Sequence, residues 1–380
     1  MKKKQQNLRD LLQSLVVAAI IFLIASNSMN SILIKPLLND GTLITHGRFS
    51  ITFDAWDTIS EDEEIISVAI GSSITRASFD GNCIEEEVDL QNFEFYNLGL
   101  SAANPYTQIT QLSSLLKAKP NVIVMELGVN SLWDLDNEQR EWPQWQSDDD
   151  YVAFRFKLDS MLMNDDDFGD WGELVREKDE RYLYSNQFER MGEWQTYTIE
   201  GSEEILRRII DNESGAALPS HSLNAPSHID SNWKDYLSTP NYRGNGWQNT
   251  TKEELQPWFD ENFPKKVTYG EYNPHHNGTL FHSVYEFMIE EMVEQNIKVI
   301  LYSGPRHPMV FNYLTPGQTD GLNTTLDSFS EIEGVYILNF LWEDWDMNNF
   351  LDWNHLDDDG RKKMCEKIGF FLNTIDMEGE

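Results

Sequence analysis

Short apolar runs alternate with longer amphipathic segments along much of the chain. Five runs have the length and the Val and Ile content of buried strands, at 65–70, 93–98, 121–127, 297–302 and 335–338. Helical patterns lie at about 105–117, 282–295 and 358–372. This alternation predicts an α/β fold, a three-layer sandwich with a mostly parallel five-stranded sheet that is covered on both faces.

One long interval interrupts the alternation. Residues 131–280 separate the third predicted strand from the next helix, which is too long for a plain loop in a compact domain. We expect a cap inserted into the sheet domain, with helical pieces at about 151–163 and 202–210. Its many aromatic residues either pack in a core or line a groove for sugar rings.

The first residues resemble a signal sequence. Three lysines at positions 2–4 and Arg9 precede an apolar segment at 11–25. No small-x-small cleavage site follows, so we expect an uncleaved transmembrane anchor with the basic end in the cytoplasm. The alternative is a cleaved signal peptide and a secreted protein.

This interpretation divides the chain into three parts. Residues 1–27 form the basic end and the transmembrane helix, 28–60 a stalk, and 61–380 an α/β domain that contains the cap at 131–280. The predicted location is the cell membrane, with the α/β domain outside the cytoplasm.

The charge of the chain excludes one class of partner. There are 64 acidic and 29 basic residues, which gives a formal net charge of −35 and a pI near 4.4. Such a surface repels phosphate groups, so we expect no nucleic-acid partner. The acidic runs at 148–150 and 165–167 lack the alternating ligands of a calcium loop, and no metal site is expected.

Two cysteines are present, Cys83 and Cys365. Neither has the spacing to Cys or His that a zinc site requires. We expect two separate buried thiols, because the sequence does not supply the Cβ geometry of a disulfide. A single disulfide is the alternative for a domain in an oxidising compartment.

Polar residues stand where the predicted strands end. Gly71-Ser72-Ser73 follows the first strand, a turn that can expose a serine hydroxyl or simply cap a helix. Gly99 follows the second strand, Gly128-Val129-Asn130 the third, and Asp352-x-x-His355 precedes the last helix. The carboxyl ends of parallel strands meet at one edge of a sheet. Together these residues offer a nucleophile, a base, a group that orients the base, and donors for an oxyanion.

In this order, the four blocks resemble those of the SGNH, or GDSL-like, hydrolase family, from about residue 65 to the end of the chain. The resemblance implies an SGNH or flavodoxin-like fold in which Ser73 is the nucleophile, His355 the base and Asp352 its orienting partner. It implies an oxyanion hole formed by the N–H groups of Ser73 and Gly99 and the side-chain amide of Asn130. No cofactor is implied. The family most often has Asp where this chain has Ser72.

The function expected from this site is that of a serine esterase or O-acyltransferase. It would act on small acyl groups, such as acetyl, on extracellular glycans or similar esters, and a multispanning acyltransferase could act with it. The alternative from another class is a catalytically idle protein of SGNH fold that binds surface glycans or serves in their assembly.

A Pro-rich loop at 303–308 follows the fourth predicted strand and should also reach the edge where the site lies. Arg306 could hold a carboxylate or a sugar hydroxyl, and His307 could contact the acyl group. The simpler expectation is that both residues only shape the turn.

Overall fold

The structure is a computed structural model. It describes residues 2–29, 52, 55–56, 58–60, 64–100, 103, 108–109, 111–128, 246–267, 280–314 and 316–377. Most of the stalk expected at 28–60 lies outside the described residues. So does most of the cap expected at 131–280, including both of its predicted helices.

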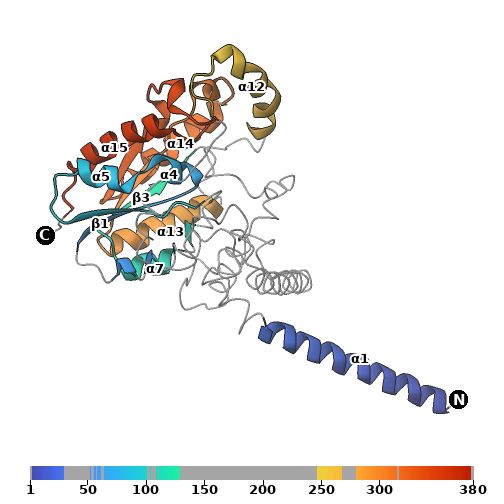
Figure 1. Ribbon diagram of the computed structural model, residues 1–380. Coiled ribbons are helices and arrows are strands. Elements are labelled where there is room, and N and C mark those ends of the chain that lie inside the picture. The colour runs from blue at the N-terminus through green and yellow to red at the C-terminus, as the bar shows by residue number, and fades with distance from the viewer. Residues whose placement is uncertain are drawn as a thin grey trace, which may run out of the picture.

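A five-stranded sheet in which all neighbouring strands are parallel forms the centre of the α/β domain (Figure 1). Its order is β2-β1-β3-β4-β5. The strands are β1 (Ile65–Ile70), β2 (Phe93–Asn97), β3 (Val122–Glu126), β4 (Lys298–Ser303) and β5 (Val335–Asn339). All five predicted strands are thus confirmed, each to within one residue at either end.

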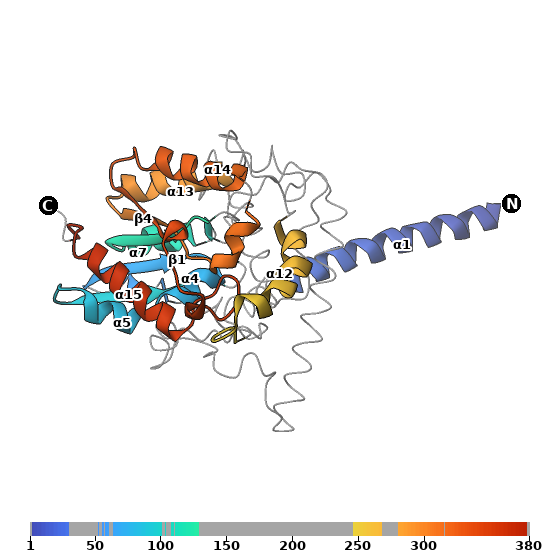
Figure 2. The ribbon, with the colours of Figure 1, turned by 90° about the horizontal axis from the view of Figure 1, so that it is seen from above.

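Helices cover both faces of the sheet (Figures 1 and 2). On one face lie α5 (Gly81–Glu87) and α15 (Asp358–Leu372), and on the other α7 (Leu112–Ala118) and α13 (Leu280–Glu294). The ring of His282 on α13 stacks on Phe329 of α14 (Pro316–Phe329), which places α14 beside α13. The predicted α/β architecture with a parallel sheet is therefore present in the described part of the chain.

Further helices and 3₁₀ turns complete this description. They are α4 (Ser73–Ser78) after β1, α12 (Lys252–Val267) within the expected cap, and three 3₁₀ turns, η4 (Pro308–Asn312), η5 (Phe340–Trp342) and η6 (Met347–Asn349). Helix α12 begins at a capping box, because Thr251 Oγ1 accepts from Glu254 N–H while the Glu254 carboxylate accepts from Thr251 N–H. This signal was present in the sequence but was not used to predict the helix.

The middle strands are buried on both sides, which explains why they read as continuous apolar runs. Every residue of β3 is buried, and Val122 to Met125 are fully inaccessible. Between the sheet and α5 and α15 lies a core cluster that includes Phe95, Val124 and Ile368. At the carboxyl end of β3, Glu126 is a charged residue with only 4% of its surface exposed.

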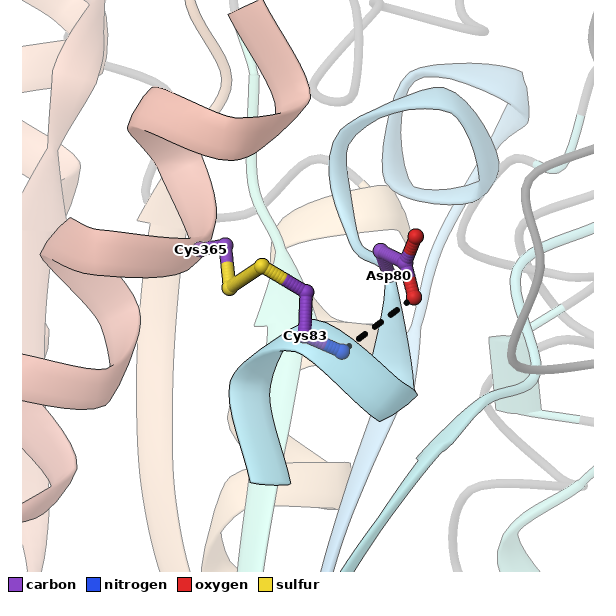
Figure 3. The surroundings of a disulfide bond; sticks show 3 residues. All are labelled: Asp80, Cys83 and Cys365. Carbon is purple, nitrogen blue, oxygen red and sulfur yellow. Dashed lines mark hydrogen bonds between the residues drawn. A yellow bond between two sulfur atoms is a disulfide. The ribbon is translucent and has the colours of Figure 1, made fainter. Parts of the chain in front are cut away.

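A disulfide joins Cys83 on α5 to Cys365 on α15, with the two Cα atoms 6.1 Å apart (Figure 3). Asp80 caps α5 by accepting a hydrogen bond from Cys83 N–H at 3.3 Å. The expectation of two separate thiols is therefore wrong. The sequence could not show this pairing, because it depends on the packing of two helices that lie 282 residues apart.

Helix α1 (Lys2–Met29) occupies the segment in which the basic and apolar leader was predicted. The large apolar side chains that the structure describes between Leu11 and Ile24 are half or more exposed, from 50 to 62%. Among the helices in the described part of the chain, none is long and apolar enough to cross a membrane.

Candidate active site

The turn after β1 exposes the hydroxyl of Ser73 at the carboxyl edge of the sheet. Gly71 has φ +155°, and a Cβ atom at this position would lie 2.0 Å from Thr75 Oγ1. Ser72 is the residue that caps α4, since its Oγ accepts from Ile74 N–H at 3.1 Å. Because Ser72 supplies the cap, the hydroxyl of Ser73 is left for another partner.

That partner is His355, which is 282 residues away in the sequence. The Nε2 atom of His355 lies 2.8 Å from Ser73 Oγ. On the other side of the ring, Nδ1 lies 2.7 Å from Asp352 Oδ2 and 2.9 Å from Oδ1. Ser73, His355 and Asp352, three of the residues singled out from the sequence, therefore form one continuous line of hydrogen bonds.

The environment of Asp352 keeps its carboxylate charged. Burial by itself would raise the pKa of Asp352, but hydrogen bonds from the His355 ring and from two backbone N–H groups outweigh it and hold the pKa below its usual value. These N–H groups belong to Asn354 and His355, at 2.9 and 3.0 Å from Oδ1. A charged Asp352 assigns the proton to His355 Nδ1, which leaves Nε2 free to accept from Ser73.

Gly99 does not have the role that was expected. Its N–H donates to Asn97 Oδ1 at 3.0 Å, inside the fold. The Nδ2 group of Asn97 in turn donates to the carbonyls of Thr75, Arg76 and Phe79. The N–H of Gly99 is thus committed to Asn97, which removes it from the set of oxyanion donors.

Close packing explains the glycine at position 99. A Cβ atom there would lie 2.8 Å from Arg76 N and 3.0 Å from Ser72 O, both backbone atoms of the turn that carries the nucleophile candidate. Gly99 therefore lets the end of β2 press against α4.

Of the other predicted oxyanion donors, one can be placed. In the described part of the chain, no backbone hydrogen bond uses Ser73 N–H, which stands at the first position of α4. Asn130 lies outside the described residues. The backbone N–H of Ser73 therefore remains a candidate donor to an oxyanion.

Glu126, the buried carboxylate at the end of β3, was not predicted from the sequence as part of the site. One of its oxygens lies 2.7 Å from Ser72 N and 2.7 Å from Thr75 Oγ1, and Ser72 Oγ is within 2.9 Å of both oxygens. A charged residue that ends an otherwise apolar strand, Val122-Ile123-Val124-Met125-Glu126, was the signal that could have identified it.

The hydrogen bonds around Glu126 also connect α4 to β4 and β3 to α13. The hydroxyl of Thr75 also shares a hydrogen bond with Tyr302, whose pKa is raised well above its usual value by burial and by the nearby charge of Glu126. Tyr285 donates from its hydroxyl to the backbone carbonyl of Glu126 at 2.8 Å. Strands β3 and β4 and helix α13 thus fix the turn that presents Ser73.

The two loop residues after β4 differ in their surroundings. Arg306 is 2% exposed, and its side chain donates to the Pro305 carbonyl. His307 is fully buried, against the rings of Trp247, Phe259 and Phe350.

His307 is held as a neutral ring. Its Nδ1 accepts from Met309 N–H at 3.3 Å, which caps η4. Burial lowers the pKa of His307 from 6.5 to about 4. These contacts are those of a packing residue, the simpler of the two alternatives that the sequence left open.

Within the described residues, no group of three or more His, Cys, Asp or Glu side chains could hold a metal ion. The chain matches no protein-family model and no curated protein. The indication of a function therefore comes from the geometry of Ser73, His355 and Asp352.

Proposed function

We propose that the protein is a serine esterase or O-acyltransferase with Ser73 as nucleophile. The observation that supports it is the line of hydrogen bonds from Ser73 Oγ through the His355 ring to the Asp352 carboxylate. The three side chains come from the turn after β1 and from the segment before α15. Acyl transfer through serine requires a hydroxyl, an imidazole and a buried carboxylate that are hydrogen-bonded in this order.

In the proposed reaction, Ser73 Oγ attacks the ester carbonyl while His355 Nε2 takes the hydroxyl proton. Asp352 stabilises the imidazolium that forms. The tetrahedral intermediate then collapses as His355 gives this proton to the departing alcohol, which leaves an acyl group on Ser73. Water or an acceptor hydroxyl attacks this acyl group, again with His355 as base, and Ser73 is regenerated.

The negative oxygen of each intermediate needs donors. Ser73 N–H is one candidate, and the SGNH resemblance suggests the Asn130 amide as a second. With Gly99 removed from this set, two donors remain in the proposal.

The substrate and the location are further parts of the proposal. We infer small acyl esters of extracellular glycans, and a cell-membrane location through the N-terminal segment. The disulfide between Cys83 and Cys365 supports an oxidising compartment. Mass spectrometry of the protein purified from its native membranes should find residues 1–10 still attached, and a mature N-terminus beyond Ala25 would favour secretion instead.

The test of the chemistry uses the full chain and a fluorophosphonate probe, with p-nitrophenyl acetate as substrate. We expect the probe to label Ser73, as peptide mapping would show, and Ser73→Ala to lose both labelling and turnover. Ser67→Ala is the matched control, because Ser67 is a buried serine on β1 in the same stretch. A wild-type protein that is neither labelled nor faster than Ser73→Ala would instead favour the idle, glycan-binding alternative.

The same assay separates the two reaction types. A neutral disaccharide added as acceptor should yield acetylated sugar in competition with acetate if the protein is a transferase. With an ester hydrolase, the ratio of acetate to p-nitrophenol released would be the same with and without the disaccharide.

A further inference from the structure

Arg306 is a buried cation that forms no ion pair within the described residues. The residue is 2% exposed, and the one hydrogen bond that the described residues show for its side chain is from Nη1 to the Pro305 carbonyl at 3.3 Å. None of the ion pairs among the described residues includes Arg306. A guanidinium has five N–H donors, so most of its hydrogen-bonding capacity is unused.

The guanidinium lies next to the candidate active site. A Cβ atom at Gly304 would be 3.7 Å from Arg306 Nη1 and 2.6 Å from the side chain of Ile74, the residue that follows Ser73. Arg306 also interacts electrostatically with Asp352 of the candidate triad and with Glu126 beneath the turn. It therefore belongs to the same edge of the sheet as the nucleophile candidate.

The nearby carboxylates are already occupied. Glu126 accepts from Ser72 and Thr75, and Asp352 accepts from His355 and two backbone N–H groups. Removal from water lowers the pKa of Arg306, which shows that its charged form is disfavoured where it stands. A buried charge is costly unless it is paired and hydrogen-bonded. The missing partner would have to come from outside the described fold.

We propose that Arg306 binds a carboxylate carried by the ester substrate, so that the protein selects acyl esters of acidic molecules. This inference rests on the proposed function and specifies its substrate class. The planar guanidinium offers two parallel N–H groups that match the two oxygens of a carboxylate.

The charge of the whole protein adds a reason for such a residue. With a net charge of −35, the surface repels anions in solution. A cation held beside the site gives an acidic substrate a local attraction that the rest of the surface does not provide. Added salt should therefore increase kcat/KM for an anionic ester, because it screens the repulsion at long range while the buried contact persists.

Two matched pairs of esters test the proposal on the full chain. One pair is 4-acetoxybenzoate and its methyl ester, with the carboxylate on the alcohol side. The other is mono-p-nitrophenyl adipate and p-nitrophenyl hexanoate, with the carboxylate on the acyl side. For each pair the measured quantity is the ratio of kcat/KM for the anionic ester to that for the neutral one.

We expect Arg306→Gln to lower this ratio at least tenfold in one of the pairs, and Arg306→Lys to restore part of it. Lys298→Gln is the matched control, because it removes the same charge at the opposite end of β4 and should leave both ratios unchanged. If Arg306→Gln slows both members of each pair equally, Arg306 is a structural residue of the loop and the proposal is wrong.

A binding measurement separates this inference from the proposed function. Calorimetry with Ser73→Ala, which cannot form the acyl intermediate, measures the affinity for each intact ester. We expect the anionic member of one pair to bind at least tenfold more weakly when Arg306→Gln is added. This result would support the carboxylate site even if no ester were turned over, whereas equal affinities would overturn it even in an active esterase.

Discussion

The carboxylate of Glu126 holds Ser72, the residue immediately before the nucleophile candidate, by both its backbone and its side chain. Ser72 N–H donates to one oxygen at 2.7 Å, and the Ser72 hydroxyl lies 2.8 and 2.9 Å from the two oxygens. The same hydroxyl accepts from Ile74 N–H. The end of β3 thus determines where α4 begins, and with it the position of Ser73.

We predict that Glu126 acts as a positioning residue. Glu126→Ala would leave Ser72 N–H unpaired inside the fold and should lower kcat about 10- to 100-fold, with a smaller change in KM. Glu126→Gln retains one acceptor oxygen and should recover part of the loss. Hydrogen bonds to a buried charge contribute about 1.5–3 kcal/mol each, so the free energy of unfolding should fall as well.

A purely structural role would give a different result. Loss of stability alone lowers the fraction of folded enzyme, and the kcat per fluorophosphonate-labelled site would then equal that of the wild type. Thr75→Val, which removes one hydroxyl from the same carboxylate, provides an intermediate variant for this comparison.

A second prediction concerns Asp352. In Asp352→Asn the amide oxygen can still accept from the N–H groups of Asn354 and His355, so the amide NH₂ would face His355 Nδ1. That nitrogen would then have to accept, and the proton would move to Nε2, which could no longer accept from Ser73. We expect kcat to fall about 10³- to 10⁴-fold with little change in thermal stability. A loss of less than tenfold would contradict a catalytic Asp352.

A third prediction follows from the packing of Gly99. A Cβ atom at this position would press on backbone atoms of Arg76 and Ser72, which have little room to move. We expect Gly99→Ala to lower both kcat and the free energy of unfolding, the latter by about 1–3 kcal/mol. Gly334→Ala is the control, because Gly334 has a positive φ of 87° that strains an alanine, whereas the added Cβ atom would only make ordinary contact with Val293 at 3.8 Å. We expect Gly334→Ala to lower the free energy of unfolding and to leave kcat unchanged.

The case of Gly99 shows where prediction from the sequence ended. The glycine was noticed, and the SGNH resemblance implied that its N–H faces the substrate, whereas the structure shows this N–H donating to Asn97, two residues earlier. The disulfide was missed for a different reason, since it depends on how α5 and α15 pack, and its two cysteines are 282 residues apart in the sequence. A contact between side chains of segments far apart in the sequence cannot be predicted from the local pattern of apolar and polar residues.

Elements with a strong local pattern were predicted well. Helix α15 has the predicted bounds because Asp357 caps it and apolar residues recur along it at helical spacing. The strands were found because a parallel sheet that is buried on both faces requires continuous apolar runs. By contrast, α14 was not predicted, because it contains Gly, Thr and Asn, which have low helix propensity, and its ring contact with α13 through Phe329 and His282 is not visible in a local pattern.

A fourth prediction concerns the disulfide. It links α5, which follows the helix of Ser73, to α15, which follows the segment of His355. The variant Cys83→Ala/Cys365→Ala should lose about 2–5 kcal/mol in the free energy of unfolding. A reducing agent should lower the Tm of the wild type to about that of the double variant and leave the Tm of the double variant unchanged. Equal sensitivity of both proteins to the reductant would contradict the pairing.

The fifth prediction is a loss of stability in mild acid caused by His307. Its pKa is about 4 in the folded protein, whereas an unfolded chain has an ordinary histidine pKa near 6.5. Between these values the unfolded state binds the additional proton, so stability decreases as the pH falls through this window and the loss is complete near pH 4. From about pH 7 to about pH 4.5 the contribution should be roughly 2–3 kcal/mol.

His307→Asn isolates this contribution. Asparagine can still accept from Met309 N–H at the start of η4 but does not titrate in this range. Denaturant unfolding at several pH values should give a free energy that falls more steeply in the wild type than in the variant. The other titrating groups are common to both proteins and cancel in the comparison. Parallel curves would mean that His307 is already charged when folded, in conflict with its enclosure by Trp247, Phe259 and Phe350.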